Sequence, residues 1–342
     1  MTGGAAGPAD RAVVCGLGYR LPERVVTNAQ LCERLDVSED WIVGRTGISR
    51  RRWVEPGEAT SDLAVGAGRA ALESAGGGRV DAVVLATTTP DYRCPATAPD
   101  VAARLGLTGV AAFDLSAVCT GFVYGLATAA GFIAAGLAER VLLIAAEAFS
   151  TLLDPDDHTT QPIFGDGAGA VVLRRGRADE PGAVGPLVLG SDGARTELIT
   201  VKAGGSRFPL RTAVPDDGSQ YFQMRGRGVF RQSVERMSEA AAEALDRAGW
   251  QLRDVDRVIT HQANARVSAA LATRLGLPRD AAPQNIAEVG NTAAASIPVL
   301  LAQAALDQSL KPGHRVLLAA FGGGLTWGAT TLTWPELEVH AA

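Results

Sequence analysis

Short apolar runs alternate along this chain with longer alanine-rich stretches. The runs DAVVLA, ERVLLIAAEAF, DRVIT and HRVLLAAFG begin at Asp81, Glu139, Asp256 and His314 and are apolar at their centres. Short apolar runs bounded by polar and turn residues are typical of buried strands, and the stretches between them are long enough for helices. This alternation predicts mixed or parallel sheets that are covered by helices.

The alternation also repeats. Asp81 and Asp256, which begin two of the runs, are 175 residues apart, and so are Val141 and Val316 in the other two. A third pair of motifs, AALESAG and EALDRAG, is offset by 173 residues. Chance similarity between alanine-rich segments is the alternative, but three matched pairs in the same order favour an internal duplication. Two such halves predict a five-layered α/β/α/β/α body.

The division between the halves is expected near the middle of the chain. We expect an N-terminal half at residues 12–180 and a C-terminal half at 181–342. The segment 183–225 is rich in glycine, proline and charge, so it is expected to link the halves and to add surface loops. The N-terminal stretch MTGGAAGPADR has no hydrophobic signal core and is expected to be a loose tail.

Bulk composition excludes several function classes. The chain has 342 residues, is 47% hydrophobic and carries a net charge of -5. Its length allows a large core, and its negative charge argues against nucleic-acid binding. No apolar run reaches the roughly 20 residues that span a bilayer, so no membrane function is expected. The four histidines, at positions 158, 261, 314 and 340, form no ligand-spaced cluster, so no metal is expected.

Cys119 has a setting that the other three cysteines lack. The chain has no CxxC pair and no secretion signal, which predicts reduced thiols in a cytoplasm. Cys119 follows the strand-like run VAAFDLSAV and precedes the helical pattern TGFVYGLATAAGF. At a helix N-terminus, unpaired N–H groups and the helix dipole favour thiolate over thiol. Cys119 is therefore a candidate nucleophile, although a lone cysteine is more often a buried small hydrophobe.

Two later segments place polar side chains in similar settings. DRVITHQANARV carries His261 and Asn264, and AEVGNTAAASIP carries Asn291. The 175-residue offset aligns Cys119 with residue 294, close to Asn291, so the repeat puts the thiol and the carboxamide at matching helix entrances. A thiolate, an imidazole and a carboxamide indicate acyl-thioester chemistry if the fold brings them together. The alternatives are a satisfied core histidine and a helix-capping asparagine.

Six blocks together resemble a known family. They are the Cys119 segment, HQANARV, GNTAAAS, AFGGGLTWG, DWIVGRTGI and FGDGAGAVVL, and they resemble β-ketoacyl-ACP synthase III, a condensing enzyme of the thiolase fold. The resemblance runs from about residue 12 to residue 334. Degradative thiolases have a second cysteine in the C-terminal half, and this chain has none after Cys119. Chain-elongating ketosynthases have a second histidine where this chain has Asn291.

The resemblance implies a decarboxylative Claisen condensation that initiates fatty-acid or polyketide synthesis. Cys119 would accept an acyl starter, and the backbone N–H groups of Cys119 and Gly323 would form the oxyanion hole. His261 and Asn291 would stabilise the enolate formed when malonyl-ACP loses CO₂. CoA or phosphopantetheine thioesters would be substrates, and no other cofactor is implied. Two alternatives are an acyltransferase that moves the acyl group to an alcohol or amine, and a non-catalytic partner subunit that shapes an acyl tunnel.

The resemblance also assigns binding residues. Trp41 would stack on the CoA adenine, and Arg45 would lie near the CoA phosphates. His158 stands where the family often has an arginine on the other face of the adenine. The implied CoA site also includes Asn264 and Arg266.

Partner surfaces are implied as well. An acidic acyl carrier protein would dock on a group of arginines that we name the carrier patch: Arg231, Arg266 and Arg274. As solvated helix charges, these residues would be unremarkable. Cys94 replaces an aromatic residue that, in the family, closes the acyl pocket of the partner subunit. The smaller residue implies room for a longer or branched starter, and the alternative is that Cys94 is a packed thiol with no pocket role. The resemblance also implies a homodimer.

Overall fold

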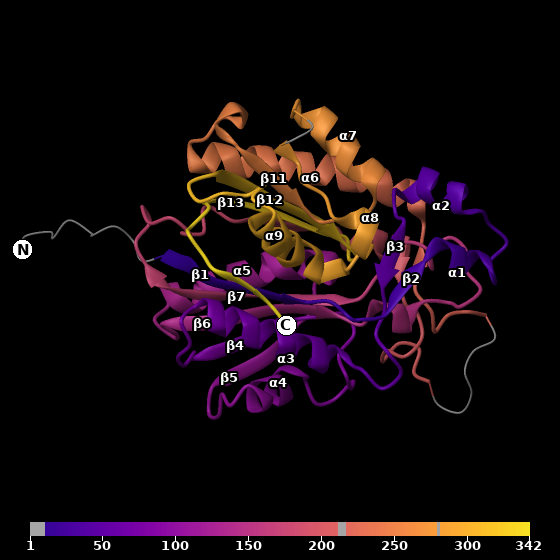
Figure 1. Ribbon diagram of the computed structural model, residues 1–342, viewed down its shortest axis with the longest axis horizontal. Coiled ribbons are helices and arrows are strands. Elements are labelled where there is room, and N and C mark those ends of the chain that lie inside the picture. Colours follow the sequence, from indigo (N-terminus) through magenta and orange to yellow (C-terminus); the bar gives the residue numbers. More distant parts are fainter. Residues whose placement is uncertain (1–10, 211–216, 279–280) are drawn as a thin grey trace, which may run out of the picture.

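Two sheets and their covering helices build the protein (Figure 1). The computed structural model describes residues 11–210, 217–278 and 281–342. Residues 1–10 of the predicted tail and 211–216 of the predicted linker lie outside the described residues. The strands are β1 Arg11–Arg20, β2 Val25–Thr27, β3 Arg50–Arg52, β4 Ala82–Ala86, β5 Ala111–Leu115, β6 Arg140–Glu147, β7 Gly167–Gly176, β8 Val188–Ser191, β9 Ile199–Thr200, β10 Gln223–Met224, β11 Arg257–Thr260, β12 Arg315–Gly322, β13 Thr326–Thr333 and β14 Val339–Ala341.

Helices of varied length connect these strands. The α-helices are α1 Asn28–Cys32, α2 Glu39–Thr46, α3 Thr60–Ser74, α4 Ala98–Arg104, α5 Gly121–Ala134, α6 Gly226–Ala248, α7 Ala265–Leu275, α8 Ile286–Val289 and α9 Ser296–Leu306. The short 3₁₀ helices are η1 Val118–Thr120, η2 Phe149–Leu152, η3 Gly193–Leu198, η4 Leu252–Asp254 and η6 Ala293–Ala295.

The predicted five-layered α/β/α/β/α architecture is confirmed. The first sheet has the order β14-β1-β7-β6-β4-β5, and the second has the order β11-β12-β13-β8. Helices α3 and α4 cover the outer face of the first sheet, and α6 and α7 lie on the outer side of the second (Figure 1). Helices α5 and α9 lie between the sheets and contact both. Because α5 is enclosed in this way, its sequence GFVYGLATAAGFIA has no charged residue.

The two sheets share an internal order, as a duplication requires. In each, a central antiparallel pair is flanked on one side by a parallel strand: β7-β6-β4 in the first and β13-β12-β11 in the second. Strand β14 comes from the C-terminal end of the chain but pairs with β1 in the first sheet. The proposed boundary between residues 180 and 181 falls in the connection from β7 to β8 and stays a prediction.

Close packing explains the glycines Gly16 and Gly18, which are separated by one residue in β1. A Cβ atom at Gly16 would lie 2.4 Å from the carbonyl oxygen of Ala71 in α3, and one at Gly18 would lie 2.4 Å from the Ala71 nitrogen. The two glycines therefore let α3 lie directly on the sheet. In the described part of the chain, no helix combines the length and apolar character needed to cross a bilayer.

Candidate active site

Cys119 lies at the entrance of the enclosed helix α5. It is the middle residue of η1, which leads from β5 into α5, and its side chain is 8% exposed. It belongs to a buried apolar cluster that also contains Phe149, Phe164 and Phe222, whose rings contact one another with centroids 4.3–5.0 Å apart. The thiol therefore lies in apolar surroundings.

The structure corrects the expected protonation state of this thiol. The helix N-terminus was expected to favour the thiolate, but burial raises the pKa of Cys119, and the buried carboxylate of Glu147 raises it further. The backbone amide of Cys119 opposes both effects and is outweighed. The free energy needed to remove the thiolate from water is larger than the stabilisation that the helix N-terminus provides, so the free enzyme holds a neutral thiol.

Gly322 leaves the amide of Cys119 accessible. A Cβ atom at Gly322 would lie 2.9 Å from the Cys119 nitrogen and 3.1 Å from the Thr120 nitrogen. Only glycine therefore fits beside these two N–H groups at the end of β12. The predicted oxyanion-hole residue Gly323 comes next and packs against Val118 and Ile199. The two predicted donors, Cys119 and Gly323, thus lie on segments that touch each other.

His261 is buried directly after β11. Its side chain is 2% exposed, and Nδ1 lies 2.7 Å from Oγ of Ser296. That hydroxyl also accepts a 3.4 Å hydrogen bond from the backbone N–H of Gln262. In the tautomer in which Nδ1 accepts a hydrogen bond from Ser296, the other ring nitrogen, Nε2, is the N–H donor. Burial lowers the pKa of His261 to about 3, so the imidazole is neutral at ordinary pH.

The carboxamide of Asn291 is oriented by backbone groups. Its Oδ1 accepts a 2.9 Å hydrogen bond from the N–H of Ala293, and Nδ2 lies 3.4 Å from the carbonyl oxygen of Ala263. With Oδ1 occupied, the group presents its N–H₂ side as a donor. The Ala263 contact also joins the Asn291 segment to the loop that carries His261.

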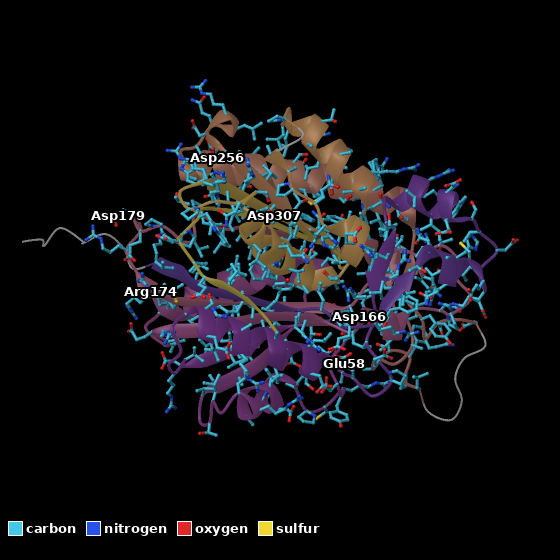
Figure 2. All side chains as sticks on the ribbon, in the orientation of Figure 1. Glu58, Asp166, Arg174, Asp179, Asp256 and Asp307 are labelled. Atoms are coloured by element: carbon cyan, nitrogen blue, oxygen red, sulfur yellow. The ribbon has the colours of Figure 1, made fainter. Side chains whose placement is uncertain are left out.

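The FGDGAGA block and the residue before it hold the backbone of Asn291 by hydrogen bonds. The backbone of Asn291 donates to the Ile163 carbonyl at 2.8 Å and accepts from the Gly165 N–H at 3.0 Å. Asp166 is fully buried and accepts hydrogen bonds from Val54 and Ser150. In Figure 2, Asp166 lies at the end of β7 nearest α2 and β3. Burial raises the pKa of Asp166 to about 6. The block therefore forms a turn whose backbone supports Asn291.

Two short helices bring the three predicted catalytic residues together. Cys119 belongs to η1, and Ala293, which contacts both His261 and Asn291, belongs to η6. The helices η1 and η6 contact each other, and Cys119 and Ala293 belong to one buried apolar cluster. Segments that are more than a hundred residues apart in the sequence thus meet in one place.

The predicted CoA residues fall into two groups. The rings of Trp41 and His158 lie 5.7 Å apart in an edge-to-face arrangement, and the guanidinium of Arg45 lies 4.7 Å from the Trp41 ring centre. Asn264 caps α7 and donates to the carbonyl of Arg45 at 3.1 Å, while Arg266 donates to the carbonyl of Gly44 at 2.8 Å. The second group therefore fixes α2, which carries Trp41, against α7.

The remaining predicted residues lie at the surface. The three arginines of the carrier patch are all exposed, one on α6 and two on α7, and these helices contact each other. Cys94 is exposed in the single chain and lies in the segment before α4. Its pocket role depends on a partner subunit and stays a prediction.

Three residues of the site were not identified from the sequence. Ser296 orients His261, and its signal is its place in the GNTAAAS block. Glu147 is the buried last residue of the apolar strand β6, and its signal is an acidic residue directly after an apolar run. Arg51 is buried and donates to Val26, Asn28 and Pro162, next to the segment that pairs with Asn291. Burial lowers its pKa to about 10. In the sequence it is one of three consecutive arginines, so it resembled a solvated charge.

Comparison with known proteins gives one consistent result. The family model described as 3-oxoacyl-[acyl-carrier-protein (ACP)] synthase III matches residues 113–193, and the model of its C-terminal part matches residues 245–334. A β-ketoacyl-[acyl-carrier-protein] synthase III from Streptomyces coelicolor is 58% identical over 96% of this chain and 98% of its own length. One from Pseudomonas aeruginosa is 52% identical over 95% and 97%.

Solved structures agree. The 3-oxoacyl-(acyl carrier protein) synthase III of Pseudomonas aeruginosa superposes with a TM-score of 0.89 at 50% identity, covering 96% of this chain and 99% of that one. The priming β-ketosynthase of the R1128 polyketide pathway gives 0.86 at 34% identity, covering 97% and 99%. With this fold, this arrangement around Cys119 and these identities, the chain belongs to the β-ketoacyl-[acyl-carrier-protein] synthase III family of condensing enzymes.

Proposed function

We propose that Cys119, His261 and Asn291 carry out the two half-reactions of the family's decarboxylative condensation. This reaction joins an acyl starter to malonyl-ACP and initiates fatty-acid or polyketide synthesis. The observation that carries the assignment is the contact between η1 and η6, which places the thiol next to the segment that orients the imidazole and the carboxamide.

In the first half-reaction the Cys119 sulfur attacks the carbonyl carbon of the starter thioester. The new S–C bond forms, the bond to the carrier sulfur breaks, and the thiol proton leaves with the released carrier thiol. Because burial keeps Cys119 neutral, this proton moves during the attack and not before it. The N–H groups of Cys119 and Gly323 stabilise the oxyanion, and loss of one such donor typically costs about 10²–10³ in rate.

In the second half-reaction malonyl-ACP loses CO₂. The electron pair of the broken C–C bond becomes an enolate on the thioester, and the enolate oxygen needs hydrogen-bond donors. Neutral His261, with its free nitrogen as the N–H donor, and the N–H₂ group of Asn291 supply them. The enolate carbon then attacks the acyl-cysteine, forms the β-ketoacyl product on the carrier and releases the Cys119 thiolate, which takes up a proton.

Residues at the surface around this site would bind the substrates. We propose that Trp41, Arg45 and His158 receive the CoA nucleotide and that the carrier patch steers an acidic acyl carrier protein. The arginine side chains are exposed, as electrostatic steering requires. We also propose a homodimer in the cytoplasm, in which Cys94 faces the acyl pocket of the partner subunit. Apart from the thioester substrates, the reaction needs no cofactor.

Intact-mass measurement tests this function directly. Incubation with a panel of acyl-CoAs is expected to add one acyl group, which peptide mapping places on Cys119. Subsequent addition of malonyl-ACP labelled in its free carboxyl group is expected to release labelled CO₂ and to remove the adduct. Acyl transfer to an alcohol or amine without CO₂ release would instead indicate an acyltransferase.

A further inference from the structure

The internal duplication gives every part of the active site a counterpart. Cys119 in η1 corresponds to Ala294 in η6, since both helices precede an enclosed α-helix and are 175 residues apart. Their first residues, Val118 and Ala293, share an uncommon positive φ, 48° and 45°. The backbones at the two helix entrances therefore have the same shape.

The residues facing these two entrances differ. Strands β6 and β12 are both eight residues long and correspond along their whole length, so Glu147, the last residue of β6, corresponds to Gly322. Gly322 leaves the amide of Cys119 accessible, as described above. At the other entrance the corresponding position holds a carboxylate.

Glu147 is completely buried at that entrance. Its Oε2 accepts hydrogen bonds from the Thr88 N–H and the Thr89 hydroxyl, both at 3.0 Å. The carboxylate also interacts with the backbone amide of Ala294. This last contact is longer than an ordinary hydrogen bond, since Oε1 has no hydrogen-bond partner in the described part of the chain.

The short helix that Glu147 contacts is the one that orients the catalytic groups. The N–H of Ala293 binds Oδ1 of Asn291 at 2.9 Å, and the backbone of Ala293 also contacts the His261 ring. Ser296, directly after η6, holds the other side of that ring. A displacement of η6 would therefore move both enolate donors, and misplacement by about 1 Å can cost roughly 10²-fold in rate.

We propose that Glu147 is a positioning residue: its carboxylate occupies the helix entrance that is equivalent to the oxyanion site and holds η6 so that His261 and Asn291 face the substrate. The proposal rests on the proposed function. One half of the duplicated fold has a glycine beside the amide of Cys119, while the other half has a buried carboxylate beside the corresponding amide of Ala294.

The charge of Glu147 gives this role a distinctive signature. Burial raises the pKa of Glu147 to about 7, and its negative charge raises the pKa of Cys119. The other groups facing it are the hydroxyls of Thr87 and Thr89 and the alanine backbone of η6. Cys119 is a titratable group whose pKa responds to Glu147. Removing the charge must therefore make the thiol easier to ionise.

Two variants test the proposal. Glu147→Gln keeps the shape and removes the charge, and it is expected to shift the pH profile of Cys119 alkylation by iodoacetamide to lower pH. Glu147→Gly copies the counterpart Gly322 and empties the entrance. It is expected to lower kcat for malonyl-ACP decarboxylation by about tenfold or more with little change in KM. Sodium formate, a carboxylate of the right size, is expected to restore part of this loss.

Asp114→Asn is the matched control. The carboxylate of Asp114 at the end of β5 caps α4 through the N–H groups of Thr97 and Ala98, both at 2.7 Å. Its loss should lower the melting temperature without shifting the alkylation profile and without a response to formate.

The outcomes separate the two proposals. An alkylation profile of Glu147→Gln that superimposes on the wild type overturns the role of Glu147, and so does a wild-type kcat in a folded Glu147→Gly. If Glu147→Gly does not fold, the test rests on Glu147→Gln: a wild-type alkylation profile together with a wild-type decarboxylation rate would overturn the role of Glu147. Failure of the wild-type enzyme to release CO₂ would count against the proposed function itself.

Discussion

Replacing Asn291 by alanine should separate the two half-reactions. Among the described residues no hydrogen bond joins the carboxamide to Cys119 or Gly323, so the oxyanion site for acylation should stay in place. Its Oδ1 accepts from Ala293 at 2.9 Å and one N–H of Nδ2 donates to Ala263 at 3.4 Å, which leaves the second N–H as the donor for the enolate. Asn291→Ala should therefore still form the acyl-cysteine while losing decarboxylation.

The size of the effect follows from the number of donors. Two groups, His261 and Asn291, stabilise the enolate, and removing one donor of this kind costs about 10²–10³ in rate, or roughly 3–4 kcal/mol. The substitution also leaves the Ala293 N–H without its partner, which costs about 1–3 kcal/mol of stability. Asn291→Asp keeps that hydrogen bond but removes the donor, so it should also lose decarboxylation.

Rapid-quench intact mass measures acylation, and CO₂ release from labelled malonyl-ACP measures decarboxylation. Asn285→Ala is the matched control, because this nearby amide bonds to Gln303 and not to the site. If Asn291→Ala lost acylation while it kept CO₂ release, the assignment of Asn291 would be refuted.

Four further predictions concern other parts of the site. Burial lowers the pKa of His261 to about 3, while the unfolded value is 6.5, so the contribution of the neutral ring to stability is full above pH 6.5 and is lost as pH falls toward 3. The difference between the melting temperatures of wild type and His261→Gln should therefore become smaller when the pH is lowered from 7.5 to 5. Ser296→Ala removes the 2.7 Å contact that orients this ring and should lower kcat for decarboxylation about tenfold or more with unchanged KM, and a wild-type kcat would count against it. Cys94→Phe should shift the acyl-CoA preference toward shorter starters, and identical preference profiles would remove Cys94 from the pocket. Charge reversal of the carrier patch should raise KM for the carrier protein in a salt-dependent manner, and an unchanged KM would exclude this docking surface.

The sequence predicted most of the architecture because buried parallel strands and enclosed helices leave strong apolar patterns. The 175-residue offset predicted two matching halves and placed Cys119 opposite the Asn291 segment. The structure shows this correspondence in the helix pair η1 and η6. The structure explains the glycines of the three-residue motif GLG at 16–18, which let α3 pack directly on β1.

Electrostatic properties of the site were not predictable in the same way. The helix entrance at Cys119 predicted a more acidic thiol, but the pKa depends on how completely the fold removes water and on the distant Glu147. Similarly, the buried role of Arg51 could not be recognised within a run of three arginines, because its burial depends on distant segments near Val26 and Pro162.

The chain by itself therefore determined the layered fold, the duplication and the residue types able to form an acyl-cysteine and an enolate, because these follow from local periodicity and from side-chain chemistry. Only the tertiary structure decided which amide lies beside Gly322, which hydroxyl lies against the imidazole and which charged groups are removed from water. These properties depend on contacts between segments far apart in the chain, and the energy of a charge depends on everything that surrounds it.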